Sequence, residues 1–171
     1  MNPSVSVEMT INEFKVVVLG ERSVGKTSLA LRYLEGHFAE TQLSTIGAYF
    51  LSKKVTYPDN SSGKMQLWDT AGQERFRSVA PMYYKNTDAA IVCYEVGDDK
   101  SFDKMKDWVS DLQNGVSDLR NLVLVVCCTK IDRTREVGTD TSLSSRGREY
   151  AGSLKCEFFE TSAKENTGID D

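Results

Sequence analysis

Eight consecutive residues of this chain have the types and spacing of a phosphate-binding loop. They read Gly20-Glu21-Arg22-Ser23-Val24-Gly25-Lys26-Thr27 and directly follow the apolar run Phe14–Leu19. The glycines let the backbone curl so that successive N–H groups point at phosphate oxygens, and the helix predicted to follow adds the positive end of its dipole. Lys26 supplies a charge for the β- and γ-phosphates, and Thr27 offers a hydroxyl to Mg²⁺. We therefore expect these residues and the adjoining Ser28 to bind a nucleotide.

A second polar group follows the third predicted strand and contains Asp69, Gly72 and Gln73. Asp69 can hold Mg²⁺ through a bound water, and Gly72 lets a backbone N–H approach the terminal phosphate closely. Gln73 carries both a donor and an acceptor, which is what orienting an attacking water requires. Together with the charge of Lys26, this pattern predicts hydrolysis of a nucleoside triphosphate, with Gln73 and Lys26 as catalytic residues.

Two later motifs predict the site of the base. Asp132 lies just beyond the fifth predicted strand, and its carboxylate can accept two bonds, from N1 and from the exocyclic amine of guanine. Adenine presents an acceptor at N1, so a buried carboxylate would lose those bonds. The Lys130 stem can lie along the base plane. Ser162, Ala163 and Lys164 follow the last predicted strand and can offer backbone N–H groups to the guanine carbonyl.

The elements that must position these residues follow from the hydrophobic pattern. Near-continuous apolar runs predict strands buried on both faces, hence a parallel sheet with helices on each side; they are Val16–Leu19, Ala89–Tyr94 and Leu122–Cys128. Helical patterns lie between them, at Lys26–Glu35, Ser101–Asn114 and Ser142–Ser153. In the second of these helices we expect Ser101 to be the N-cap and Gly115 to mark the C-terminal stop.

The remaining strands complete a mixed sheet. The turn-forming cluster Pro58–Gly63 separates two strand patterns, Ile46–Tyr57 and Lys64–Trp68, and predicts an antiparallel hairpin. Lys155–Phe159 is the last predicted strand. The sequence therefore predicts an α/β fold: a six-stranded, mostly parallel sheet flanked by helices, with one antiparallel strand. Such folds bind ligands at the carboxyl ends of their strands, where all the motifs above fall.

Composition limits the class of protein. A length of 171 residues fits one domain, and a net charge of −4 with a pI near 5.2 argues against binding to nucleic acid. The four cysteines lie in or beside apolar runs and predict buried, reduced thiols of a cytoplasmic protein. No signal peptide and no apolar run long enough to span a membrane is visible.

Taken in this order, the motifs resemble those of the small GTPases of the Ras superfamily, most closely the Rab branch. The resemblance covers Phe14–Gly168. Its Rab-like strings are Ser44-Thr45-Ile46-Gly47-Ala48, Trp68-Asp69-Thr70-Ala71-Gly72-Gln73-Glu74-Arg75-Phe76, Ala80-Pro81-Met82-Tyr83-Tyr84 and Glu160-Thr161-Ser162-Ala163-Lys164. It implies the small G-protein fold and a monomer that binds GTP or GDP with Mg²⁺.

The resemblance also implies roles for further residues. Thr45 binds Mg²⁺ and the γ-phosphate only in the GTP state and takes part in catalysis, and Phe38 packs edge-on against the base. The metal site then comprises Thr27, Thr45 and Asp69. Phe50, Trp68 and Tyr83 match the aromatic triad that engages effectors. The implied partners are effector proteins, an exchange factor and a GTPase-activating protein, with peripheral association with membranes in vesicular traffic. Hydrolysis is expected to be slow without the activating protein.

The ends of the chain carry two expectations. Residues 1–12 are expected to form a flexible extension, and residues 13–171 the GTPase domain. The resemblance implies a further helix and a tail with prenylated cysteines after Gly168, so we expect the domain to be shortened at its C-terminus. Cys127 and Cys128 are internal, so no membrane anchor is expected within this chain.

Two residues depart from the family pattern. Thr129 stands where Rab proteins usually have Asn; it keeps a hydroxyl but lacks the reach of the amide, so we expect guanine selectivity to survive and affinity to fall modestly. Arg22 stands in the phosphate loop where the Ras branch favours Gly. Its side chain either crowds Gln73 and slows hydrolysis, acts in cis on the transition state and speeds it, or points into solvent.

Three functions compete. The first is a GTP-hydrolysing switch in membrane traffic. The second is a guanine-nucleotide-binding scaffold with negligible hydrolysis, supported only by Arg22 and Thr129. The third is a metabolic ATPase or kinase, which Asp132 with Lys130 opposes, as does the lack of a further substrate domain. Because fold alone does not decide function, the base-reading carboxylate carries the choice of a guanine nucleotide.

Overall fold

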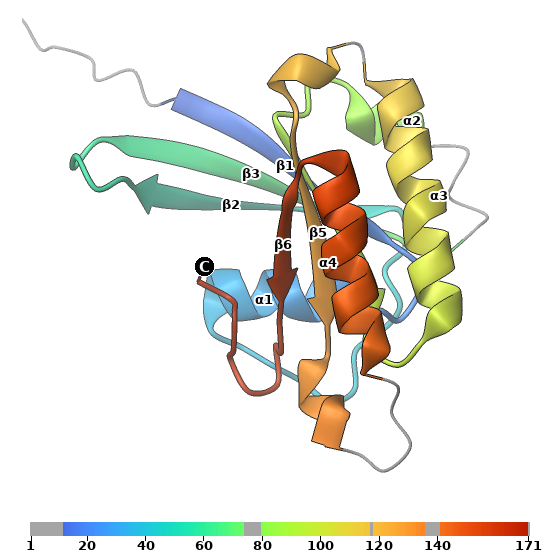
Figure 1. The fold of residues 1–171 in the computed structure, drawn as a ribbon. Helices are drawn as coiled ribbons and strands as arrows, with labels where there is room; N and C mark the ends of the chain where they lie inside the picture. The colour runs from blue at the N-terminus through green and yellow to red at the C-terminus, as the bar shows by residue number, and fades with distance from the viewer. Residues whose placement is uncertain (1–11, 74–79, 117, 136–140, 171) are drawn as a thin grey trace, which may run out of the picture.

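The structure is a computed structural model, and it describes residues 12–73, 80–116, 118–135 and 141–170 (Figure 1). The predicted flexible extension, residues 1–12, lies outside the described residues except for Asn12, which begins the first strand.

A six-stranded sheet forms the centre of the described chain, in the order β2-β3-β1-β4-β5-β6 (Figure 1). Its strands are β1 Asn12–Gly20, β2 Ala48–Thr56, β3 Ser62–Thr70, β4 Ala89–Glu95, β5 Val123–Thr129 and β6 Glu157–Glu160. β2 pairs antiparallel with β3, and every other pairing is parallel. The predicted mixed sheet and its single antiparallel strand are confirmed. The hairpin turn is tighter than predicted, since Ser62 and Gly63 already belong to β3.

Helices cover both faces of the sheet. α1 (Lys26–Glu35) packs on β1 and β3, whereas α3 (Asp99–Gly115) and α4 (Ser142–Leu154) pack on β4, β5 and β6 (Figure 1). The sequence analysis missed three short elements: α2 (Ala80–Tyr84) and the 3₁₀ turns Leu119–Asn121 and Ile131–Arg135. Each is five residues or fewer, too short to show an apolar periodicity.

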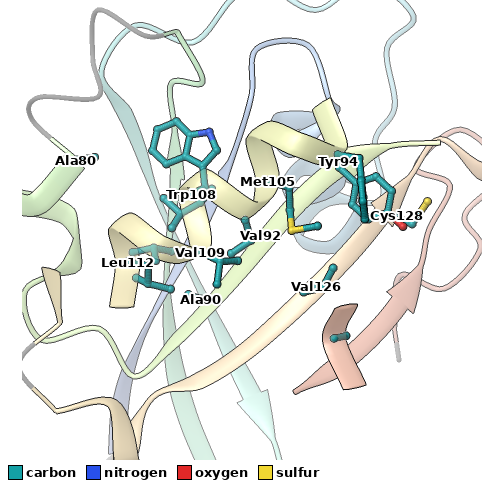
Figure 2. Close-up of a cluster of buried hydrophobic side chains, with 14 of the residues drawn as sticks. Ala80, Ala90, Val92, Tyr94, Met105, Trp108, Val109, Leu112, Val126 and Cys128 are labelled. Atoms are coloured by element: carbon teal, nitrogen blue, oxygen red, sulfur yellow. The ribbon is translucent and has the colours of Figure 1, made fainter. Parts of the chain in front are cut away.

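The strand side chains divide into two cores because successive residues point to opposite faces. On β1, Val17 and Leu19 face the α3 and α4 side, while Val16 and Val18 face α1. Figure 2 shows the larger core, in which Met105 and Trp108 of α3 lie over Val92 of β4. Both faces are therefore sealed by apolar contacts, and the carboxyl ends of the strands are left to carry polar side chains.

Of the two predictions about the ends of α3, the N-cap at Ser101 was wrong and the stop at Gly115 is confirmed. The N-cap is Asp98, whose carboxylate accepts the backbone N–H of Ser101 at 3.2 Å, and the helix begins at Asp99 rather than Ser101. Gly115 ends the helix as its last residue, with Val116 in extended geometry after it. A Cβ at Gly115 would lie 2.5 Å from Cδ2 of Tyr84. Close packing against α2 therefore requires this glycine, not a left-handed cap.

Candidate functional site

A cavity of about 490 Å³ lies at the carboxyl ends of the strands and collects most of the predicted site residues. On its wall are Arg22, Ser23, Gly25, Lys26, Thr27, Ser28, Phe38, Thr45, Gly72, Gln73, Thr129, Lys130, Asp132, Ala163 and Lys164. Gly20, Glu21, Val24, Asp69 and Ser162 stand behind that wall and contact residues on it through the bonds described below. Five separate segments of the chain, spread from residue 22 to residue 164, therefore meet at one cavity.

The phosphate loop holds its lysine in place with its own backbone. Lys26 is buried, and its ammonium donates to the carbonyl oxygens of Gly20 at 2.9 Å and Glu21 at 2.8 Å. Burial lowers the pKa of Lys26, and the nearby carboxylates of Asp69 and Glu21 oppose that shift. A buried cation held by neutral carbonyls and facing a cavity is suited to an anionic group.

Gly72 brings the end of β3 against this loop. A Cβ at Gly72 would lie 2.5 Å from the Lys26 ammonium and would collide with the backbone of Glu21. Only glycine allows that approach. Gln73 follows it, half-buried on the cavity wall, where its amide can reach a water beside a bound phosphate.

Three oxygen-bearing side chains converge where a metal ion was predicted. The Thr27 hydroxyl lies 2.9 Å from the Thr45 hydroxyl and donates to Oδ2 of Asp69 at 2.6 Å. Thr45 comes from the loop before β2, so that loop is folded onto the start of α1. Oxygen donors of this kind suit Mg²⁺.

Asp69 shows that this cluster fits a cation. Its carboxylate is fully buried, and among the described residues Oδ1 has no hydrogen-bond partner. Burial raises the pKa of Asp69, while the Thr27 hydroxyl and the Lys26 charge work against the shift. A buried carboxylate oxygen without a partner costs free energy, and a metal ion or a metal-bound water would satisfy it.

The other end of the cavity has the predicted base-binding groups. Asp132 lies on the 3₁₀ turn after β5, and its Oδ1 accepts the Ser162 hydroxyl at 2.5 Å. Oδ2 of the same carboxylate remains available to the cavity, which Asp132 lines with Ala163 and Lys164. The stem of Lys130 lies over the phosphate loop, since a Cβ at Gly25 would stand 3.7 Å from its Cε. These contacts fit a planar base held between the two loops.

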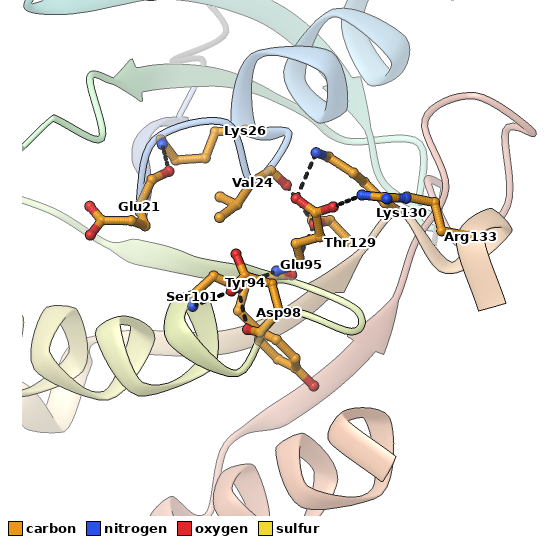
Figure 3. A network of polar contacts seen from close by, with 10 residues as sticks. All are labelled: Glu21, Val24, Lys26, Tyr94, Glu95, Asp98, Ser101, Thr129, Lys130 and Arg133. Carbon is orange, nitrogen blue, oxygen red and sulfur yellow. Dashed lines mark hydrogen bonds and ion pairs between the residues drawn. The ribbon is translucent and has the colours of Figure 1, made fainter. Parts of the chain in front are cut away.

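Thr129 has a structural contact that was not predicted. Its buried hydroxyl is 2.5 Å from the Val24 carbonyl and 2.9 Å from the Tyr94 carbonyl, so it ties the phosphate loop to β4 (Figure 3). One hydroxyl proton is shared between two acceptors.

Sequence reasoning missed two residues that hold the base-binding loops. Arg32 of α1 donates to the carbonyls of Ala163 at 2.6 Å and Gly36 at 2.7 Å, and its guanidinium lies 5.9 Å from the centre of the Phe38 ring. Glu95, the last residue of β4, accepts from Lys130 and Arg133 (Figure 3). No motif marks either one, because their partners lie far away in the sequence.

Arg22 is exposed at the cavity wall, and no hydrogen bond or ion pair joins its side chain to another described residue. That position leaves it free to lie across the opening beside Gln73.

The three predicted effector-binding aromatics form one cluster on β2, β3 and α2. The rings of Phe50 and Trp68 are 5.4 Å apart, and those of Trp68 and Tyr83 are 6.1 Å apart. Three further apolar side chains are exposed: Leu43 is 90% exposed, Ile46 76% and Met82 75%. Large apolar side chains exposed in this way are candidates for contact with a protein partner.

The described cysteines are all free, as predicted; Cys93, Cys127 and Cys128 are buried and Cys156 is half-buried. Among the residues that the structure describes, no helix is both long and apolar enough to cross a bilayer.

The fold and the cavity together define a nucleotide-binding α/β protein with a phosphate loop, and comparison with known proteins gives the family. The model of the Ras family matches residues 15–171. The chain is 42% identical to the Ras-related protein Rab-5A of Dictyostelium discoideum over 94% of this chain and 77% of the relative. It is 40% identical to the GTP-binding protein ypt5 of Schizosaccharomyces pombe, over 91% and 72%. RabJ of Dictyostelium discoideum is 40% identical, over 92% of this chain and 59% of the relative.

The chain therefore belongs to the Ras family. Within that family it is a Rab-like small GTPase, the class of slow GTP hydrolases that act in membrane traffic. The scaffold alternative is not favoured by these relatives.

Proposed function

We propose that this chain binds GTP and GDP with Mg²⁺ and hydrolyses GTP slowly. Between the GTP and GDP states it changes the arrangement of two loops, residues 38–47 and the segment that contains Gly72. The observation that carries the proposal is the meeting of Thr27, Thr45 and Asp69 within hydrogen-bond distance, in the same cavity that Asp132 lines. The cavity thus has groups for phosphate and metal at one end and a carboxylate for the base at the other. A single nucleotide that spans the cavity would use both ends.

Guanine is selected at the Asp132 end. The Ser162 hydroxyl occupies Oδ1 and fixes the direction of the carboxylate, so Oδ2 and the remaining lone pairs can accept from the two N–H groups of guanine. Adenine would place a lone pair against that charge. Phe38 would pack edge-on against the base, and the Lys130 stem would lie along its plane.

The phosphates are held at the Lys26 end. The Lys26 ammonium would face the β- and γ-phosphates, and the hydroxyls of Thr27 and Thr45 with the Asp69 carboxylate would hold the metal. Bound Mg²⁺ would neutralise charge that develops on the phosphates. Gln73 orients the attacking water, and no arginine beyond Arg22 lies on the described cavity wall. The proposed rate is accordingly slow until an activating protein adds one.

The switch follows from where Thr45 is held. Its hydroxyl lies 2.9 Å from that of Thr27, with residues 38–45 folded along the cavity. A bound γ-phosphate with its Mg²⁺ would add a further partner for Thr45 and for the Gly72 backbone, and its loss on hydrolysis would release the two loops. The aromatic cluster, in which Phe50 is exposed and Trp68 and Tyr83 are half-buried, is the proposed surface for effector proteins in membrane traffic.

The experiment is displacement of fluorescent GDP in Mg²⁺ by GTP, GDP and ATP, followed by single-turnover hydrolysis on the same sample. We expect GTP and GDP to compete and ATP to fail by a factor of about 10⁴. Phosphate release should be detectable and should fall by about 10² or more in Gln73→Ala. An Asp132→Asn variant should lose guanine binding, since its amide N–H would oppose the N–H groups of the base. Competition by ATP, or hydrolysis unaffected by Gln73→Ala, would overturn the proposal.

A further inference from the structure

A buried carboxylate stands directly behind the base-binding end of the cavity. The side chain of Glu95 is 11% exposed, and its two oxygens accept from different cations (Figure 3). Oε2 is 2.7 Å from the Lys130 ammonium, and Oε1 bonds to Nη1 of Arg133. Its backbone N–H donates to the Ser101 hydroxyl at 3.0 Å, which fixes the end of β4 from which the carboxylate projects.

The two cations, Lys130 and Arg133, flank Asp132, the residue proposed to recognise the base. Lys130 lies in the left-handed region with φ of 57°, a backbone conformation that is unfavourable for a lysine and has to be held by its surroundings. The Arg133 backbone N–H donates to the Lys130 carbonyl at 2.9 Å, closing the turn on which Asp132 lies. Asp132 thus stands between two residues that the same carboxylate holds.

The burial of the Glu95 carboxylate favours both of its ion pairs. A carboxylate at 11% exposure is costly without partners, and two cations satisfy both of its oxygens. The guanidinium of Arg133 is 45% exposed, so its loss would leave water able to reach the turn while Glu95 would keep only Lys130. Lys130 alone would then hold the turn to Glu95, while the bonds to Ser162 and the Thr161 carbonyl would hold its other side.

We propose that Glu95 and Arg133 are positioning residues for guanine recognition: through the Arg133 guanidinium, Glu95 holds the turn so that the Asp132 carboxylate meets the base amine. The proposal deepens the nucleotide site and rests on the proposed function. Neither side chain needs to touch the nucleotide. The contact that they control is the hydrogen bond that the exocyclic amine of guanine donates to the Asp132 carboxylate. Hypoxanthine lacks this amine.

The test measures the affinities of GDP and inosine diphosphate, which differ only in that amine, for the wild type and for Arg133→Gln, Arg133→Lys and Glu95→Gln. The wild type should prefer GDP by at least about tenfold, the value of a hydrogen bond to a charged group. In Arg133→Gln, GDP binding should weaken about fivefold and inosine diphosphate binding much less, so that the preference shrinks. Arg133→Lys should restore most of the preference, and Glu95→Gln should reduce it.

The control is Arg120→Gln, which removes a surface ion pair with Asp118 at a guanidinium that is 90% exposed, and which should leave both affinities unchanged. If Arg133→Gln and Glu95→Gln weaken both nucleotides equally, or leave both unchanged, the two residues do not position Asp132 and the inference is wrong. If the wild type itself shows no preference for GDP over inosine diphosphate and ATP, the proposed guanine-binding function is wrong. That outcome is distinct from failure of the positioning role of Glu95 and Arg133.

Discussion

Asp69 illustrates how one residue can be unfavourable for the empty protein and necessary for its function. Its carboxylate is buried, with one oxygen bonded to Thr27 and the other lacking a partner among the described residues. Burial raises the pKa of Asp69, so the charged form is disfavoured in the folded state. The cost is relieved when a cation is bound.

The first prediction concerns Asp69→Asn in nucleotide-free protein kept in EDTA. A carboxyl whose folded pKa is raised lowers stability as pH rises through the window between its unfolded and folded pKa values. The variant should therefore be more thermally stable than the wild type at pH 7, and the difference should shrink toward zero at about pH 4 or below. It should also lose the stabilisation that Mg²⁺ with GDP gives the wild type. Melting temperatures across pH measure both effects, and a wild type that is the more stable at pH 7 would contradict the argument.

A second residue-scale prediction concerns Thr129. Its hydroxyl already bonds to the Val24 and Tyr94 carbonyls, so it supports the phosphate loop but has no N–H pair to extend toward the base. Thr129→Asn should slow GDP dissociation by about threefold to tenfold while leaving the preference for GDP over ATP unchanged. Stopped-flow release of fluorescent GDP measures the rate. Dissociation as fast as in the wild type would show that the departure from Asn carries no cost.

The third prediction at the residue scale concerns Arg22. Its exposed side chain shares the cavity wall with Gln73, and a group of that size would crowd the attacking water if it lay across the opening. We expect Arg22→Gly to raise the single-turnover rate by about threefold or more, because small displacements of a reacting group are costly. A slower variant would instead identify Arg22 as an arginine that acts on the transition state, and an unchanged rate would place it in solvent.

At the scale of elements, the cap of α3 determines where the longest described helix begins. The Asp98 carboxylate accepts from Ser101 N–H, and Ser101 in turn holds the end of β4. Asp98→Ala should lower the free energy of unfolding by about 1 kcal/mol and the melting temperature by about 2–4 °C. Asp103→Ala, which breaks an exposed ion pair with Lys106 in the same helix, is the matched control and should change little. Equal effects of the two changes would argue against a cap at Asp98.

The elements also show why sequence was a good guide to most of the fold. Buried strands such as Val123–Thr129 are marked by continuous apolar residues, and α3 by its apolar spacing, so their existence and order were predictable. The start of α3 was misplaced because Asp98 and Ser101 are both good capping residues. Only the backbone geometry distinguishes them.

The site was predictable in so far as its residues are local motifs. The phosphate loop and the Asp132 turn can be found because each needs several residue types in close succession. Glu95 was missed because its partners lie 35 and 38 residues away in the chain, and Arg32 because Ala163 lies 131 residues away. Their roles arise only when β4, β5 and α1 meet at one end of the sheet.

At the scale of the whole molecule, the cavity joins two loops that flank the aromatic cluster. Thr45 lies beside Thr27 and Gly72 beside the Lys26 ammonium on the same cavity, and Phe50, Trp68 and Tyr83 lie on β2, β3 and α2. A single terminal phosphate can therefore order both loops and the surface between them. That coupling is the central claim of the proposed switch.

The most direct measurement is amide hydrogen exchange across residues 38–47 with Mg²⁺ and either GDP or a non-hydrolysable GTP analogue. The account predicts that exchange is slower by about tenfold or more with the GTP analogue than with GDP. Thr45→Ala should lose that difference, although its base-binding residues are unchanged. Equal exchange in the two nucleotide states of the wild type would contradict a switch operated by Thr45.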